Sequence, residues 1–299
     1  MEFNTMTGKT AIITGANSGL GLETAKTFAR LDARIILAVR NLDKGQTAKQ
    51  EILDESPEAT IDVMQLDLSD LESVRAFAET FTSRFDSLDL LVNNAGVMTP
   101  PYAKTKDGFE LQFGSNHLGH FALTGRLLPL LLRTENSRVV TLSSLAHRNS
   151  AIYFDNLDGS KGYKAMKFYG QSKLANLMFA TELDDRLKQH GLATQSMACH
   201  PGISSTNLFK IGGREMPRIF KGLMNRYLQP ATMGALPTVY AATATSLTGG
   251  EYVGPDGKGQ RRGYPTLEKP DPAVNDEASR QKLWDVSEKL TGVTFNFSN

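Results

Sequence analysis

The sequence has a single cysteine, no long apolar run and almost no net charge. Cys199 has no second cysteine with which to form an intramolecular disulfide, a composition typical of a reducing compartment. No apolar run approaches the roughly 20 residues of a membrane-spanning helix, and the N-terminus lacks the apolar core of a secretion signal. A net charge of +1 over 299 residues leaves no basic excess for nucleic acid. These absences predict a cytoplasmic protein without a membrane anchor or a nucleic-acid partner.

The chain does contain a regular alternation of short apolar runs and amphipathic segments. Strands are expected at 10–14, 34–39, 61–65, 88–92, 138–142, 194–199 and 251–254, and helices at 20–31, 42–53, 71–81, 109–132 and 169–190. Such βαβ alternation predicts an α/β fold, a single Rossmann-type doubly wound parallel sheet of about seven strands with helices on both faces. One domain is expected over 6–299, because no linker or repeat divides the chain. Residues 1–5 are interpreted as a candidate cloning remnant.

Three local features refine this outline. Ser69 is expected to be the N-cap of the 71–81 helix, with Glu72 completing a capping box. Residues 146–167 are interpreted as a loop inserted before the 169–190 helix. Residues 206–229 carry many apolar side chains after the sixth strand and are interpreted as a substrate lid. An irregular surface excursion or a contact with a neighbouring subunit explains the composition of 206–229 as well.

A glycine-rich turn follows the first strand and opens the first helix. Its glycines, Gly15, Gly19 and Gly21, allow the backbone to approach a pyrophosphate at the N-terminus of a helix. The same turn makes Asn17, Ser18 and Leu20 candidate cofactor residues. No Gly-Lys-Ser/Thr follows, which disfavours a P-loop nucleotidase.

The residues at the ends of the next three strands predict which dinucleotide binds. An acidic residue after the second strand would hold a ribose 2′-hydroxyl, but this chain has Arg40, which suits a 2′-phosphate. We therefore predict that the cofactor is NADP(H). The alternative is that Arg40 is an ordinary exposed arginine without a role in cofactor binding. Further candidate cofactor residues follow the second, third and fourth strands: Asn41, Asp67, Leu68, Asn94, Ala95 and Gly96.

Tyr169 and Lys173 stand four residues apart on a predicted helix and therefore share one face. A phenol has a pKa near 10, and a nearby ammonium and an oxidised nicotinamide would favour the phenolate. The pair predicts acid–base chemistry beside a nicotinamide. A Tyr-x-x-x-Lys spacing also occurs by chance.

These motifs together resemble the short-chain dehydrogenase/reductase family over nearly the whole chain. The resemblance rests on Thr14-Gly-x-x-x-Gly-x-Gly21, Asn93-Asn-Ala-Gly96, Asn116, Ser143-Ser144, Tyr169-x-x-x-Lys173 and Pro201-Gly202, all in the family's order. Arg138 to His147, Asp155-Asn-Leu, Ser172 to Asn176 and His200-Pro-Gly202 are similar to the retinol dehydrogenase-like branch, with WW-domain oxidoreductases and protochlorophyllide reductases. The membrane-bound retinol enzymes carry an apolar N-terminal anchor that we do not find here, which leaves the retinoid substrate open.

The resemblance implies a role for each catalytic residue. Tyr169 would exchange the proton, Ser144 would hold the carbonyl oxygen, Lys173 would bind the nicotinamide ribose, and Asn116 would anchor a water in a proton relay. Spacing alone does not choose between Ser143 and Ser144. Further cofactor residues are expected after the sixth strand, at Pro201, Gly202, Ile203 and Thr206.

The predicted function is a hydride transfer between NADP(H) and an apolar ketone, aldehyde or secondary alcohol. A binding protein that senses NADP(H) without turnover is the alternative, and a methyltransferase-type fold is a more distant one. No metal is expected, because the histidines lack ligand partners at suitable spacing. A homo-oligomer is compatible with the sequence.

Overall fold

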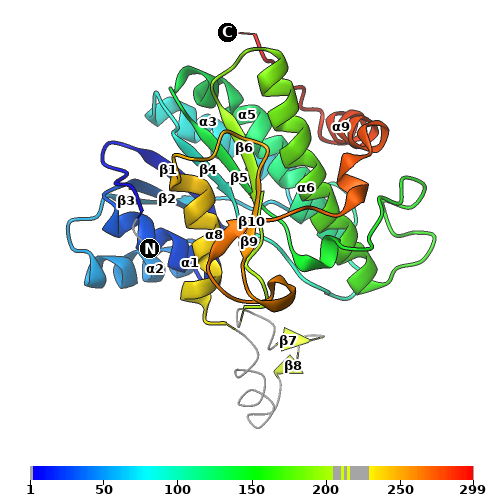
Figure 1. Cartoon of the computed structure of the whole chain (residues 1–299), viewed down its shortest axis with the longest axis horizontal. Coiled ribbons are helices and arrows are strands. Elements are labelled where there is room, and N and C mark those ends of the chain that lie inside the picture. The colour runs from blue at the N-terminus through cyan, green and yellow to red at the C-terminus, as the bar shows by residue number, and fades with distance from the viewer. Residues whose placement is uncertain (1–2, 205–209, 212–213, 216–228, 299) are drawn as a thin grey trace.

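The structure is a computed structural model that describes residues 3–204, 210–211, 214–215 and 229–298 of the chain (Figure 1). Eight strands form one sheet: β1 (Thr10–Thr14), β2 (Arg34–Val39), β3 (Ile61–Gln65), β4 (Leu90–Asn93), β5 (Arg138–Leu142), β6 (Gln195–Cys199), β9 (Tyr252–Pro255) and β10 (Pro265–Leu267). A separate antiparallel pair joins β7 (Lys210–Ile211) to β8 (Arg214–Glu215).

The sheet has the order β10-β9-β6-β5-β4-β1-β2-β3. All neighbours pair in parallel except β9 and β10, which are antiparallel. All residues of β1 are buried, as expected for a central strand covered on both faces. The predicted doubly wound sheet is confirmed. The eighth strand, β10, was not predicted, because Pro265–Leu267 is short and only partly buried.

Helices cover both faces of the sheet. They are α1 (Gly19–Arg30), α2 (Leu42–Glu55), α3 (Leu71–Arg84), α4 (Leu111–Phe113), α5 (Gly119–Arg133), α6 (Ala165–Gln189), α8 (Ala231–Thr243) and α9 (Glu277–Thr291). One apolar core joins the sheet to α1, α2 and α8, and another joins it to α3, α5, α6 and α9. Shorter segments are the π-helical turn η1 (Gly114–Leu118) and the 3₁₀ turns η2 (Leu145–His147), η3 (Lys258–Gln260) and η4 (Pro272–Asn275).

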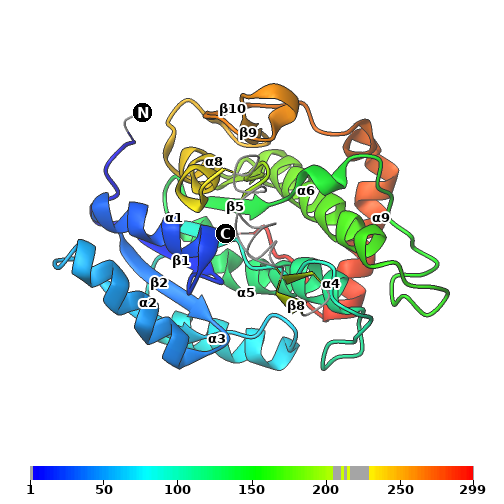
Figure 2. The same ribbon diagram turned by 90° about the horizontal axis from the view of Figure 1, so that it is seen from below.

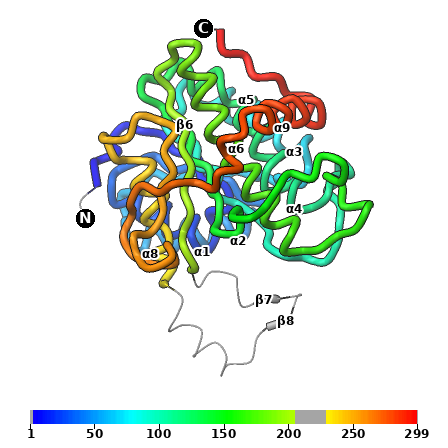
Figure 3. The backbone as a smooth tube through the Cα atoms, turned by 45° about the vertical axis from the view of Figure 1, so that its right-hand side comes forward, coloured from blue at the N-terminus to red at the C-terminus, as the bar shows by residue number. Residues whose placement is uncertain are grey.

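The C-terminal helix and tail pack on the outside of α5 and α6. In Figures 1 and 2, α9 lies beside α6, and the tube in Figure 3 follows the chain from β10 to this position. Trp284 of α9 contacts Phe121 of α5 edge-on and stacks against Phe179 of α6. Phe295 in the tail adds a fourth aromatic ring to this cluster.

Many predicted element ends shift by one to three residues, and two features at helix starts differ more clearly from the predictions. Asp70, not Ser69, is the N-cap of α3, and its carboxylate accepts from the backbone N–H of Glu72. Ser69 is unavailable because its hydroxyl donates to Asp67 Oδ1 at 2.6 Å. The helix that carries Tyr169 begins four residues earlier than expected, at Ala165.

The predicted lid at 206–229 lies largely outside the described residues, and Thr206 is among those left out. No helix in the described ranges is both long and apolar enough to cross a membrane.

Candidate active site

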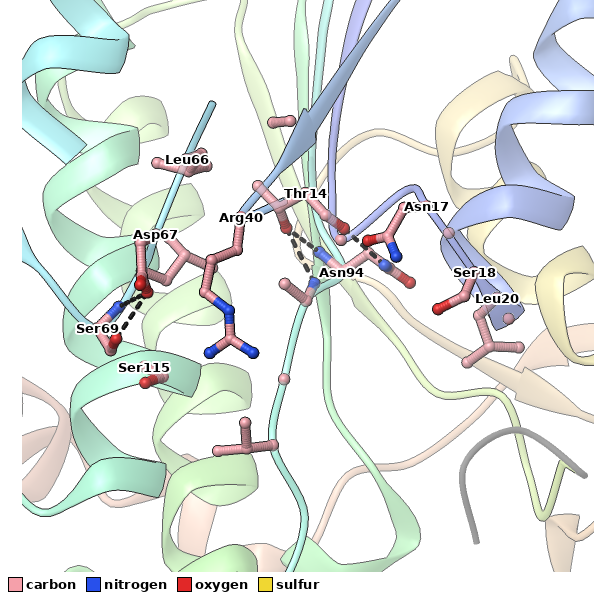
Figure 4. A pocket seen from close by; sticks show the side chains of 18 of the residues that line it. Thr14, Asn17, Ser18, Leu20, Arg40, Leu66, Asp67, Ser69, Asn94 and Ser115 are labelled. Carbon is pink, nitrogen blue, oxygen red and sulfur yellow. Dashed lines mark hydrogen bonds between the residues drawn. The ribbon is translucent and has the colours of Figure 1, made fainter. Parts of the chain in front are cut away.

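A cavity of about 380 Å³ opens at the carboxyl ends of β1, β2, β3 and β4 (Figure 4). This edge is where open α/β sheets bind their ligands. Of the predicted cofactor residues, twelve line the cavity: Gly15, Asn17, Ser18, Gly19, Leu20, Gly21, Arg40, Asp67, Leu68, Asn94, Ala95 and Gly96.

Glycines shape the wall of the cavity between β1 and α1. Gly15 and Gly19 have φ of +66° and +57°, in the left-handed region that glycine adopts without strain. A Cβ on Gly21 would lie 2.6 Å from both the Asn94 amide nitrogen and the Gly15 carbonyl oxygen. The turn therefore has no room for a side chain at Gly21, and its backbone conformation favours glycine at Gly15 and Gly19.

Arg40 supplies the positive charge of the cavity. Its guanidinium extends into the open space between Asp67 and Asn94 (Figure 4). Asp67 is held in place by Ser69, whose backbone N–H and hydroxyl both donate to its Oδ1. The predicted neighbour Asn41 does not line the cavity, because its side-chain oxygen caps α2 by accepting from Lys44 N.

A buried hydrogen-bond network fixes the cavity floor. The Thr14 hydroxyl accepts the backbone N–H groups of Asn94 and Ala95, each at 2.9 Å, and contacts His120 Nε2 at the same distance. His120 Nδ1 lies 2.8 Å from the carbonyl oxygen of Asn116, so this nitrogen must carry the hydrogen. Burial lowers the pKa of His120 to about 4. The neutral ring therefore accepts from Thr14 through Nε2.

Asn116 sits in the π-helical turn η1, between α4 and α5. Its side chain accepts from Val97 N at 2.8 Å and donates to Val97 O at 2.9 Å. The same amide nitrogen lies 3.0 Å from the Ser172 hydroxyl. The Asn116 carbonyl oxygen also accepts from His120, and the buried amide joins the cavity edge at Val97 to Ser172 of helix α6.

Lys173 reaches the same edge from α6. Its Nζ donates to the Leu142 carbonyl oxygen at 3.1 Å and lies 5.9 Å from the centre of the Tyr169 ring. A Cβ on Gly96 would lie 3.5 Å from Lys173 Nζ and 3.2 Å from Asn116 Oδ1. Gly96 therefore separates the cavity from these two side chains and keeps them within reach of it.

Tyr169 and Ser144 are the other two predicted catalytic residues, beside Asn116 and Lys173. Burial raises the pKa of the Tyr169 phenol, and hydrogen bonding to Ser144 opposes that rise. Burial also lowers the pKa of Lys173 to about 8. Among the protein's own residues, burial therefore raises the Tyr169 pKa, the opposite of the lowering expected from Lys173 and a bound nicotinamide. Ser143, the alternative serine, is instead committed to the Lys173 backbone carbonyl at 2.8 Å.

Comparison with known proteins identifies this arrangement. The family model for short chain dehydrogenases matches residues 9–215 of the chain. The chain belongs to the short-chain dehydrogenase family. It is therefore an oxidoreductase of that family, and its relatives place it in the retinol dehydrogenase-like branch.

Individual relatives agree over most of the chain. Retinol dehydrogenase 11 of Mus musculus is 45% identical over 240 residues, which cover 80% of this chain and 75% of that protein. Human retinol dehydrogenase 12 is 38% identical over 288 residues, covering 96% and 87%. A crystal structure of an uncharacterized protein from Mycobacterium paratuberculosis is 40% identical, covers 99% of this chain and 97% of its own, and superposes with a TM-score of 0.83.

The other predicted residues that the structure describes lie outside the cavity lining. Pro201, Gly202 and Ile203 form the turn after β6, and Gly202 has φ of +66°. Lining residues that sequence reasoning missed are Thr14, Ala38, Leu66, Ser69, Val97, Leu111 and Ser115. Most of them flank predicted residues at strand ends, a signal that was available. Ser115 and Leu111 come from the segment around η1, which the sequence presents as uninterrupted helix.

Proposed function

We propose that this oxidoreductase uses NADP(H) and transfers a hydride between the nicotinamide and the carbonyl or alcohol carbon of an apolar ketone, aldehyde or secondary alcohol. One observation carries the proposal. A single cavity has Arg40 in its wall and, at Gly96, abuts Lys173 and Asn116. An extended dinucleotide needs a charged site for its phosphates and a proton-transfer site at its other end.

The cavity suits NADP(H) in shape and charge. The glycine turn would hold the pyrophosphate with backbone N–H groups, and Arg40 would pair with the 2′-phosphate. A short chain dehydrogenase from Escherichia coli described in complex with NADPH supports this assignment at 25% identity and a TM-score of 0.56. The bound cofactor would supply or accept the hydride.

The protein's own residues would handle the proton. In reduction, Tyr169 donates its phenolic proton to the substrate oxygen, while the Ser144 hydroxyl stabilises the charge on that oxygen. The raised pKa of Tyr169 keeps the phenol protonated for this step. In oxidation the phenol must first lose its proton, which the Lys173 ammonium favours by its charge. Asn116, bonded to Val97 and Ser172, would hold the relay to solvent in place.

An apolar substrate is supported by the relatives and by the rim of the cavity. The relatives named as retinol dehydrogenases act, by that name, on a long apolar alcohol. In this chain, Val97 and Leu111 line the cavity, and Met98, next to Val97, is 41% exposed. These apolar side chains favour an apolar substrate at this end of the cavity. The cellular location stays a prediction.

A screen of aldehydes, ketones and alcohols with NADPH, NADH and their oxidised forms tests the proposal. We expect turnover with apolar carbonyl compounds and a preference for NADPH. Turnover restricted to charged substrates would contradict the substrate class. NADPH binding without turnover of any compound would instead favour the sensor function.

A further inference from the structure

A buried histidine–carboxylate pair lies behind the turn that follows β6. His200 Nε2 is 3.0 Å from Glu268 Oε2, and both side chains are at most 1% exposed. His200 ends the run from β6, whereas Glu268 follows the edge strand β10, so the pair links two elements 68 residues apart. Burying a carboxylate is costly unless it is well bonded, and the partners of the Glu268 carboxylate are His200 and, at 3.7 Å, Arg148 Nη2.

The hydrogen bonds of His200 fix its tautomer. The backbone N–H of Gly202 donates to His200 Nδ1 at 3.1 Å, so that nitrogen carries a lone pair. Nε2 therefore carries the hydrogen and donates it to Glu268. In the other tautomer, Nδ1–H would face the N–H of Gly202, and the turn would lose this bond. Glu268 thus selects the form of His200 that holds Gly202.

The surrounding segment holds the same turn at further points. Ile203 N donates to the Arg261 carbonyl oxygen at 2.7 Å, and Gln229 Nε2 donates to the Pro201 carbonyl oxygen at 2.5 Å. Gly263 N in turn donates to Gln229 Oε1. The chain between β9 and β10 is therefore a support for residues 201–203.

A second histidine extends this support to the catalytic serine. The Tyr252 ring lies 5.3 Å from the His200 ring and 5.5 Å from the His147 ring, centre to centre. His147 Nδ1 donates to the Ser144 carbonyl oxygen at 2.6 Å. The β6 turn and the Ser144 turn are thus packed against one aromatic side chain.

Gly254 shows how closely the pair is packed. A Cβ at this position of β9 would collide with His200 Nε2 and Glu268 Oε1. Glycine at this position therefore leaves the space in which the two polar groups meet.

We propose that His200 and Glu268 are positioning residues that fix the Pro201–Gly202 turn against the nicotinamide half of the cofactor. The inference rests on the proposed function, because it requires that the dinucleotide reach from Arg40 to this turn. The proposal predicts that loss of the pair weakens binding of the nicotinamide end of the cofactor and leaves binding of the adenosine end unchanged.

Two ligands separate those ends. NADPH occupies both, whereas adenosine 2′,5′-bisphosphate carries only the adenosine end with its 2′-phosphate. We expect Glu268→Leu to raise the Kd for NADPH by about tenfold while the Kd for the bisphosphate stays within about twofold of wild type. Glu268→Gln, which keeps an oxygen to accept from His200 Nε2, should recover most of the NADPH affinity.

Glu251→Leu is the matched control. Glu251 directly precedes β9, the strand that pairs with β10, and its carboxylate accepts from Thr248 N and Gly249 N. This variant should leave both Kd values unchanged. His200→Asn offers a second route if Glu268→Leu does not fold, because the Asn oxygen can still accept from Gly202 N–H. It should bind NADPH more tightly than His200→Leu.

The outcomes are distinct. A selective loss of NADPH affinity in Glu268→Leu, with recovery in Glu268→Gln, supports the positioning role. Equal losses for both ligands, or no loss for either, overturn it, as does His200→Asn binding NADPH no better than His200→Leu. A wild-type protein that binds neither ligand contradicts the proposed function itself, and the inference with it.

Discussion

The Thr14 hydroxyl and His120 Nε2 lie 2.9 Å apart, although 106 residues separate them in the sequence. The contact joins the end of β1 to α5, directly after the π-helical turn η1 that carries Asn116. Because His120 is neutral and holds its hydrogen on Nδ1, Thr14 donates to it and remains free to accept from the backbone of β4's end. The cavity floor therefore depends on one hydroxyl.

Replacing this hydroxyl should destabilise the protein. Thr14→Val keeps the shape but leaves the N–H groups of Asn94 and Ala95 without their acceptor, at a cost of about 1–3 kcal/mol in the free energy of unfolding. Urea denaturation measures the loss, and NADPH should bind more weakly because the floor shifts. Thr14→Ser restores an acceptor and should recover most of the stability and most of the NADPH affinity. A Val variant as stable as wild type would show that the network contributes little.

Arg40 is expected to determine the cofactor preference. Arg40→Asp removes the partner of the 2′-phosphate and adds repulsion, so the ratio of kcat/KM for NADPH over NADH should fall by about tenfold or more. Arg133→Asp, the same change at the exposed end of α5, is the control and should leave the ratio unaltered. A wild-type enzyme with equal kcat/KM for both cofactors would contradict the assignment.

Buried Lys173 is expected to lower the free energy of unfolding at neutral pH. Burial lowers its pKa from 10.5 to about 8 in the folded state, so the folded protein disfavours the ammonium. Below pH 8 Lys173 is protonated in both the folded and the unfolded state, and the buried ammonium lowers the free energy of unfolding by its full amount. As the pH rises toward 10.5 the folded state loses its proton first and the cost fades.

Lys173→Met tests the direction of this pH dependence of stability. The variant should be more stable than wild type at pH 7, by up to about 3 kcal/mol, with a smaller gain at pH 10. The Leu142 carbonyl keeps a partner because Asn176 also donates to it. Lys289→Met on the exposed side of α9 should show the same difference from wild type at both pH values. A gain for Lys173→Met that does not change with pH would refute the linkage.

The sequence alone predicts the layers of the fold because buried parallel strands and amphipathic helices leave local patterns. It also predicts the turn around Gly15 and Gly21, where chain geometry demands glycine. Other features depend on contacts between distant segments. The choice of Asp70 over Ser69 depends on Asp67, which takes the Ser69 hydroxyl. The His200–Glu268 pair depends on the β10 strand, whose sequence gives little sign that it joins the sheet.

The π-helical turn at Gly114–Leu118 is a further example. Its residues include the weak helix formers Gly114 and Asn116, but composition does not distinguish a π-helical turn from a break. The bonds from Asn116 to Val97 and Ser172 join this turn to segments that lie elsewhere in the sequence. Likewise, the raised pKa of Tyr169 follows from burial by the folded chain, which spacing on one helix does not reveal.

The most direct test of the account is a single turnover of an apolar aldehyde by NADPH-loaded wild type and Tyr169→Phe. The substitution removes only the phenolic hydroxyl, so NADPH should bind with a Kd within about twofold of wild type, while the loss of nicotinamide absorbance slows by about 10²–10⁴-fold. Tyr153→Phe, the same change in the loop before α6, should react like wild type. If Tyr169→Phe reacts within a few-fold of wild type, Tyr169 is not the proton donor and the proposed mechanism is wrong.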